Sequence, residues 1–294
     1  MTVRALVSRV FLQEDLNFLL SNRIPRHLAT ASWDGSAKSS IPGCAIRRSR
    51  CGGVSPISTW RKLKRPGFPV CTTALPRKLK PGARPADPDP SVLTSPCDAI
   101  VGAAGKIAGT ELIQAKGFPY TLLDLLQDPQ LVETYRDGCY VTLRITSSMY
   151  HRFHAPQDCR VEQVTYISGD TWNVNPIALR RVEKLFCKNE RAVIRTRLQG
   201  SAAQPGALVT LVPVAAILVA SIRLHCVDVL LHQDYRGAKM LASSARYDKG
   251  EEMGWFQHGS TIIVFAPAGF ALCDGVRTGD VIRAGQALLR APPA

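Results

Sequence analysis

The tripeptide Gly259-Ser260-Thr261 places a hydroxyl directly after a peptide carbonyl that no side chain shields. If a base removes the proton from Ser260 Oγ, this oxygen can attack the carbonyl carbon of Gly259, and the chain would cut itself at that bond. The same tripeptide is also typical of a tight turn that leads into a strand, because short motifs match by chance. Other residues able to do acid–base chemistry must decide between the two interpretations.

Two histidines, His151 and His154, stand three positions apart with Arg152 between them. On a helical turn both rings would share one face. A metal pair is one alternative, but no third ligand of suitable spacing is visible and the glutamate of a His-Glu-x-x-His helix is missing. We therefore expect acid–base chemistry or anion contact here, and no metal site. Asp98 is a carboxylate in apolar company, or else an ordinary turn aspartate after Ser95-Pro96.

Most of the ordered chain reads as strands. Residues 139–146 alternate between apolar side chains and more polar ones, which is typical of a half-buried strand. The β-branched apolar run after Ser260 predicts a buried strand. The uncharged run at 207–222 contains Pro213 and much Val and Ile, which favours two buried strands over a membrane span. Further expected elements are a strand within 93–102, strands at 161–168 and 192–198, a short helix at 176–186, and a C-terminal hairpin at 277–289 similar to those of lipoyl-type barrel-sandwich folds.

The predicted fold class is therefore α+β and predominantly β, with a barrel-sandwich-like core of antiparallel strands and an N-terminal amphipathic helical segment. At 294 residues and 46% hydrophobic, the chain can bury a large core. We expect three parts: an amphipathic membrane-associating segment at 1–29, a basic low-order stretch at 30–76, and a catalytic domain at 77–294. The composition of the middle part is also consistent with a stretch translated out of frame.

Positive charge is concentrated at the N-terminal end. Residues 1–90 hold 16 of the 37 Lys and Arg but 5 of the 23 Asp and Glu, so they carry +11 of the net +14. This asymmetry implies an anionic partner, and nucleic acid and an anionic membrane surface both qualify. The nine cysteines are scattered singly, which predicts neither a disulfide framework nor a zinc site and fits a reducing setting.

Several ordered blocks together resemble the proenzymes of the phosphatidylserine decarboxylase family. The resemblance runs from about residue 77 almost to the C-terminus, and residues 13–28 also look related. The blocks that carry it are Ser95-Pro96-Cys97-Asp98, Tyr150-His151-Arg152-Phe153-His154-Ala155-Pro156, Gly169-Asp170 with Val174-Asn175, Leu185-Phe186 with Asn189-Glu190-Arg191, and Lys249-Gly250-Glu251-Glu252-Met253-Gly254 before Gly259-Ser260-Thr261.

The resemblance implies self-cleavage between Gly259 and Ser260. In the family, the serine forms an ester with the preceding carbonyl, the ester eliminates, and residue 260 becomes an N-terminal pyruvoyl cofactor. An Asp-His-Ser relay falls on Asp98, His154 and Ser260, with the logic of a nucleophile, a base and a carboxylate that orients it. The products are a large β chain, 1–259, and a small α chain, 260–294, held together as a heterodimer.

The resemblance further implies phosphatidylserine as substrate, which forms a Schiff base with the pyruvoyl group, loses CO2 and becomes phosphatidylethanolamine. His151 or His154 is the candidate proton donor. We expect a peripheral enzyme on the cytoplasmic side of the cell membrane. Its expected partner is an anionic membrane surface, and we expect it to bind no nucleic acid. His258 replaces a leucine common in the family, and residues 30–74 lack the family's apolar helices.

Two rival functions remain open on the sequence. One is a conventional serine hydrolase in which Ser260 survives, although the Gly-x-Ser-x-Gly elbow is missing. The other is an uncut, non-catalytic basic β-domain that binds a membrane or nucleic acid and loses binding as salt rises.

Overall fold

The computed structural model describes residues 78–80, 82–113, 118–200, 204–216, 221–232, 235–256 and 260–293. The expected segments at 1–29 and 30–76 lie outside these residues. Most of the described chain forms antiparallel strands, with a few short helices, which confirms the predominantly β fold class. No helix of the described chain is both long and apolar enough to cross a membrane.

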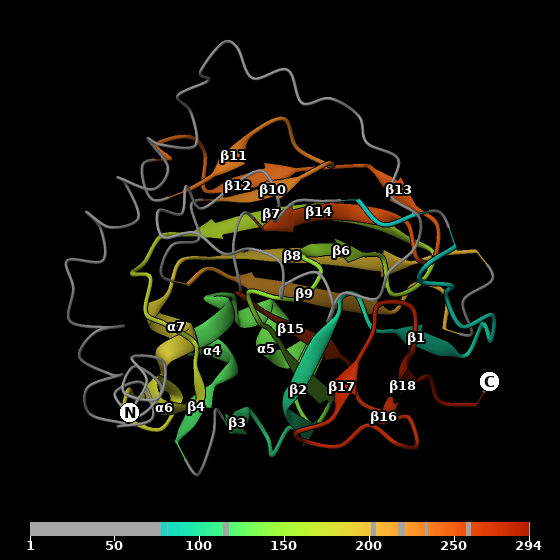
Figure 1. Cartoon of the computed structure of the whole chain (residues 1–294), viewed down its shortest axis with the longest axis horizontal. Coiled ribbons are helices and arrows are strands. Elements are labelled where there is room, and N and C mark those ends of the chain that lie inside the picture. Colours follow the sequence, from blue (N-terminus) through green and yellow to red (C-terminus); the bar gives the residue numbers. More distant parts are fainter. Residues whose placement is uncertain are drawn as a thin grey trace, which may run out of the picture.

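The largest sheet runs across the centre of the molecule (Figure 1) in the open order β12-β7-β8-β9-β15-β5-β2-β17, and β13 pairs with β7. Its strands are β2 (Ala99–Lys106), β5 (Cys139–Ile145), β7 (Cys159–Ile167), β8 (Arg191–Leu198), β9 (Leu208–Val214), β12 (Met240–Ala242), β13 (Arg246–Tyr247), β15 (Ser260–Ala266) and β17 (Val281–Ile282).

Three smaller sheets accompany the central one, in the orders β11-β10-β14-β6, β1-β18-β16 and β3-β4. Their strands are β1 (Val92–Thr94), β3 (Glu111–Ile113), β4 (Pro119–Thr121), β6 (Arg152–His154), β10 (Ile222–Leu224), β11 (Leu230–Leu231), β14 (Glu252–Phe256), β16 (Ala271–Leu272) and β18 (Ala287–Arg290). The helices are α4 (Leu122–Leu126), α5 (Pro129–Tyr135), α6 (Pro176–Leu179) and α7 (Leu185–Lys188).

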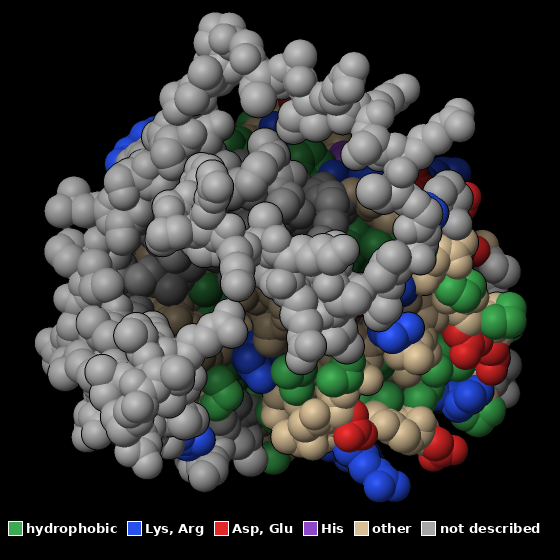
Figure 2. All heavy atoms as spheres, viewed as in Figure 1, with side chains coloured by type: hydrophobic (Ala, Val, Ile, Leu, Met, Phe, Trp, Pro, Cys, Tyr) green, Lys and Arg blue, Asp and Glu red, His purple; other side chains and the backbone are tan. Residues whose placement is uncertain are grey.

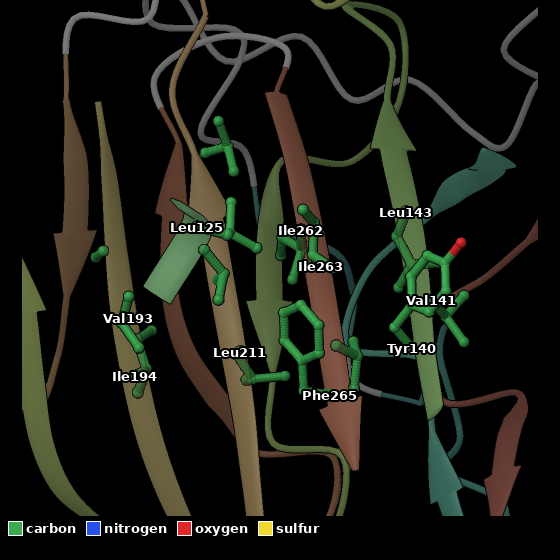
Figure 3. Close-up of a cluster of buried hydrophobic side chains, with 14 of the residues drawn as sticks. Leu125, Tyr140, Val141, Leu143, Val193, Ile194, Leu211, Ile262, Ile263 and Phe265 are labelled. Carbon is green, nitrogen blue, oxygen red and sulfur yellow. The ribbon is translucent and has the colours of Figure 1, made fainter. Parts of the chain in front are cut away.

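Strand β15 lies in the middle of the hydrophobic core. All seven of its residues are buried, and it is hydrogen-bonded to β5 on one side and to β9 on the other. Its run of β-branched and aromatic side chains suits a strand that is covered on both faces. Figure 3 shows Ile262, Ile263 and Phe265 of β15 among Leu143 of β5 and Leu211 of β9.

The two faces of the central sheet have different coverings. On one face, the Tyr135 ring of α5 lies 5.6 Å from the Phe265 ring, and its hydroxyl donates to Thr210 Oγ1 at 2.6 Å. Strands β6 and β14 meet through Phe153 and Phe256, whose rings lie 5.5 Å apart and belong to the same core. In Figure 1 these two strands overlie the central sheet, so the sheets form a sandwich-like arrangement.

Several predicted elements are confirmed. Strand β5 matches the alternating run at 139–146, β7 and β8 match two further predictions, and the uncharged run at 207–222 contains β9 and the first residue of β10 rather than a membrane span. Proline at the first helical position begins α6, as predicted.

Other expectations about elements are wrong. The apolar stretch at 93–102 contains two strands, β1 and β2, rather than one. The helix expected at 176–186 is two short helices, because the chain turns after α6 and Lys184 then adopts φ 52° before α7. The C-terminal hairpin does not form, since β17 pairs with β2 whereas β18 pairs with β1 and β16.

Candidate functional site

Ser260 is the first residue of β15 and is completely buried. Its Oγ donates a hydrogen bond to the carbonyl oxygen of Val214, the last residue of β9, at 2.6 Å. Because a carbonyl is not a proton-accepting base, this bond holds the hydroxyl without activating it. Gly259 and His258 lie outside the described residues.

Asp98 lies in the bend that leads into β2, and its carboxylate is held by three donors. Arg84 Nε donates to Oδ1 at 2.8 Å and Arg84 Nη2 to Oδ2 at 2.6 Å, while the backbone N–H of Ala284 donates to Oδ1 at 3.0 Å. The hydrogen bond to Asp98 raises the pKa of Arg84, so the guanidinium is charged at neutral pH. Asp98 is thus both a turn residue and a member of a buried polar cluster.

His154 is fixed by hydrogen bonds at both ring nitrogens. Nδ1 lies 2.9 Å from the carbonyl oxygen of Gly250, and Nε2 lies 3.1 Å from the hydroxyl of Tyr150. Burial lowers the pKa of His154 below its usual value, although the Gly250 carbonyl and the charges of Glu252 and Asp98 oppose this change. A carbonyl can only accept, so in the neutral ring Nδ1 carries the proton and Tyr150 donates to the lone pair of Nε2.

His151 and His154 do not lie on a helical turn, so the shared helical face considered for them does not arise. Residues 152–154 form strand β6, which pairs with β14, so the ladder rather than local preference sets the backbone here. Side chains three apart on an extended chain point to opposite faces. The His151 side chain is fully buried, and its carbonyl accepts the N–H of Phe256 at 3.0 Å.

The structure brings Asp98 and His154 into one neighbourhood. The backbone N–H of His154 donates to the carbonyl of Pro96 at 2.8 Å, and the charge of Asp98 acts on the His154 ring. The hydrogen bonds of Asp98, however, go to Arg84 and Ala284, and those of the His154 ring go to Gly250 and Tyr150.

Ser260 is not hydrogen-bonded to either histidine among the described residues. It follows Phe256, the partner of the His151 carbonyl, by four positions, so its Cα lies within about 14 Å of the Phe256 Cα. The structure therefore brings Asp98 and His154 together, and within the described residues no hydrogen bond joins either of them to Ser260.

Two residues of this region received no role from the sequence. Arg84 lies in a proline-rich lead-in without any periodic pattern, so nothing local indicated that its guanidinium reaches Asp98. Tyr150 stands four positions before His154, and its ring stacks on the imidazole with the centroids 5.7 Å apart. Burial raises the pKa of Tyr150 to about 12, so its hydroxyl keeps its proton at neutral pH.

A second polar cluster lies on β6 and β14 and at the residue that follows β10. Glu252 accepts hydrogen bonds from Arg152 and, at 2.8 Å, from His225 Nε2, and the Arg152 guanidinium lies 5.0 Å from the centre of the Trp255 ring. These contacts hold β14 against its neighbours just before the chain reaches residue 257. Within the described part of the chain, no three His, Cys, Asp or Glu side chains are grouped so that they could hold a metal ion.

Comparison with known proteins gives a consistent result. The family model described as phosphatidylserine decarboxylase matches residues 72–290. A phosphatidylserine decarboxylase proenzyme of Halorhodospira halophila is 37% identical over 76% of this chain and 75% of its own length. Proteins of the same name from Marinobacter nauticus and Haemophilus influenzae are 33% and 34% identical, covering 69% and 72% of this chain and 70% and 73% of their own lengths. With its β-rich fold and its Ser260 at the head of the central strand, the chain belongs to the phosphatidylserine decarboxylase family.

Proposed function

We propose that this chain cuts itself between Gly259 and Ser260, and that residue 260 then carries a pyruvoyl group with which the enzyme converts phosphatidylserine into phosphatidylethanolamine and CO2. The observation that carries the proposal is the position of Ser260. It is a fully buried serine at the first residue of the central strand, in a chain of this family. A serine required only for a turn would gain nothing from burial in the core.

The fold supports a stable heterodimer after the cut. Residues 260–294 contribute β15 to the centre of the largest sheet and β16, β17 and β18 to its surroundings. Each of β15, β17 and β18 pairs with strands that precede residue 259, namely β5 and β9, β2, and β1. The buried Ile, Val and Phe side chains of β15 contribute about 1.5–3 kcal/mol each, so cleavage leaves the small chain in place.

The surroundings of residue 260 suit a small group rich in oxygen. Among the described residues, the fully buried hydroxyl of Ser221 has no hydrogen-bond partner. Ser221 precedes β10, whose Ile222 pairs with Phe256, four positions before Ser260. A buried hydroxyl without a partner is rare, so its presence here favours a site that serves chemistry rather than packing alone.

In the proposed relay, a proton moves from the Ser260 hydroxyl to His154, and Asp98 stabilises the ring that receives it. His154 in the tautomer described above offers Nε2 as the base for the Ser260 hydroxyl, and the negative charge of Asp98 favours the protonated ring that results. For this transfer, Nε2 must exchange the Tyr150 hydroxyl for Ser260 Oγ. The pyruvoyl group, once formed, supplies an electron sink for decarboxylation, and His151 or His154 holds the proton that the product needs.

We further propose that the enzyme works as a peripheral protein on the cytoplasmic side of the cell membrane. On the face shown in Figure 2, the described acidic and basic side chains are interspersed along the lower and right edges. Residues 1–77, in contrast, contain 13 of the 37 Lys and Arg and only 3 of the 23 Asp and Glu. Attraction to an anionic membrane surface therefore depends mainly on the N-terminal part, at about 1 kcal/mol per basic residue near the surface.

The proposed activity can be tested with vesicles that contain phosphatidylserine. The purified chain and its Ser260→Ala variant are incubated with the vesicles, and phosphatidylethanolamine is quantified by mass spectrometry. We expect product only with the unmodified chain. Equal product from both proteins, or none from a chain that is cut at Gly259, would contradict the proposal.

A further inference from the structure

Glu190 is a buried carboxylate that the chemistry proposed above does not use. It directly precedes β8, and only 1% of its surface is exposed. The neighbouring Arg191 does not serve as its counter-ion, because that guanidinium is bound to backbone carbonyls of α4 and of the α7 end. A buried acid is costly, so its position relative to Ser260 is informative.

The register of the central sheet places Glu190 in one row with Ser260. Strand β8 pairs Arg191 with Val214 of β9, and β9 pairs Val214 with Thr261 of β15. One position further along both ladders, the row contains Glu190, Ala215 and Ser260. The Ala215 N–H donates to the Glu190 carbonyl at 2.8 Å, which extends the first ladder by this step.

Residues in one row of an antiparallel sheet point to the same face. Glu190 and Ser260 therefore share a face, while Arg191 and Thr261 point to the other, where the Arg191 guanidinium meets α4. Two interstrand spacings separate the Cα atoms of Glu190 and Ser260, about 10 Å. In this row of the described strands, Ala215 stands between them and carries only a methyl group, so a small group bound at residue 260 can reach the glutamate.

The charge of Glu190 changes the pKa of the neighbouring Tyr166. Burial raises the pKa of the Tyr166 hydroxyl, and the Glu190 carboxylate raises it further through its charge and a hydrogen bond. Tyr166 lies on β7 opposite Ala192, on the same face as Glu190. A carboxylate in such a low-dielectric place attracts a cation much more strongly than a carboxylate in water does.

We propose that Glu190 binds the ammonium group of the phosphatidylserine headgroup over Ala215 and accepts one of its protons. The N–H bond breaks, the proton moves to a carboxylate oxygen of Glu190, and the amine regains the lone pair with which it attacks a carbonyl carbon at residue 260. No electrons are gained or lost. The proposal rests on the proposed function and adds a recognition group for the primary amine.

The test separates the reactivity of residue 260 from recognition of the ammonium group. Four purified proteins are compared: the wild type, Glu190→Gln, Glu190→Asp and Glu133→Gln. One sample of each is treated with methoxyamine, which is uncharged at neutral pH. A second sample is treated with phosphatidylserine vesicles and cyanoborohydride. The mass added to the small chain is followed with time. Glu133 lies on the exposed side of α5 and serves as the matched control.

We expect Glu190→Gln to be cut normally and to capture methoxyamine at the wild-type rate, but to capture phosphatidylserine at least tenfold more slowly, the loss expected for one hydrogen bond to a charged group. Glu190→Asp should recover part of the rate, and Glu133→Gln should match the wild type.

Three results would overturn the inference. They are unchanged capture of phosphatidylserine by Glu190→Gln, an equal loss of methoxyamine capture, and failure of Glu190→Gln to be cut, which would assign the residue to folding or cleavage. A wild-type protein that stays uncut would instead contradict the proposed function itself, and the inference with it.

Discussion

Replacement of Arg191 by lysine should destabilise the protein strongly even though the charge is kept. The guanidinium is fully buried and donates to four backbone carbonyls. Nε donates to Leu125 at 2.7 Å and Nη2 to Asp124 at 3.0 Å, while Nη1 donates to Cys187 at 2.7 Å and to Asn189 at 2.9 Å. Burial lowers the pKa of Arg191 to about 10, so the side chain is still charged at neutral pH.

The size of the effect follows from the number of carbonyls left without a donor. A lysine ammonium is a compact donor, so it can serve the α4 carbonyls or the carbonyls after Leu185, but not both sets. At least two acceptors then lose their donor, and each costs about 1–3 kcal/mol when buried. We therefore expect Arg191→Lys to lower the free energy of unfolding by about 2–6 kcal/mol, which for a domain of this size means a Tm lower by about 4–24 °C.

Thermal unfolding should be measured in the Ser260→Ala background, in which every protein remains one uncut chain. Arg136→Lys is the matched control, because Arg136 is exposed and its guanidinium forms an exposed ion pair with Glu133 three positions earlier. That substitution should leave the Tm almost unchanged, because exposed ion pairs contribute little to stability. If the two variants have the same Tm, the assignment of the carbonyl contacts as stabilising is refuted.

Three further predictions concern the site and its supporting strands. Because burial lowers the pKa of His154, its ring stays neutral below pH 6.5. The rate of self-cleavage should therefore begin to fall only below pH 6.5 as the solution is made more acidic. A fall that begins above pH 6.5 would argue against His154 as the base. Asp98→Asn leaves Arg84 facing a neutral amide, so this variant should fold with a free energy of unfolding lower by about 1–3 kcal/mol and stay uncut; cleavage at the wild-type rate, followed by intact mass, would remove Asp98 from the relay. In Gly254→Ala, the added Cβ would overlap the Arg223 carbonyl, so β14 must move away from β10, with a loss of about 1–3 kcal/mol in thermal unfolding; an unchanged Tm would show that the contact is loose.

The strands were predictable where local sequence decides them. The alternation at 139–146 and the β-branched run after Ser260 identified β5 and β15, because such runs are short, apolar and bounded by turn residues. Their pairing was not predictable. The positions of β17 and β18 were close to those expected, but β17 pairs with β2 and β18 with β1, far away in the sequence, so the expected hairpin is replaced by two long-range contacts.

The candidate site was predictable only in part for a related reason. The spacing of His151 and His154 fits a helical turn as well as a strand, and pairing of β6 with β14 decided in favour of the strand. The partners of Asp98 come from the lead-in and from the C-terminal segment, which no local pattern links to it. The row that joins Glu190 to Ser260 likewise exists only once three strands are in register.

The central claim is tested most directly by the intact mass of the purified protein under denaturing conditions, measured beside the Ser260→Ala variant. The account predicts two chains from the unmodified protein, ending at Gly259 and beginning at residue 260, and one uncut chain from the variant. The small chain should have the mass of a pyruvoyl terminus and resist Edman degradation. A single full-length mass identical to that of the variant would contradict the account.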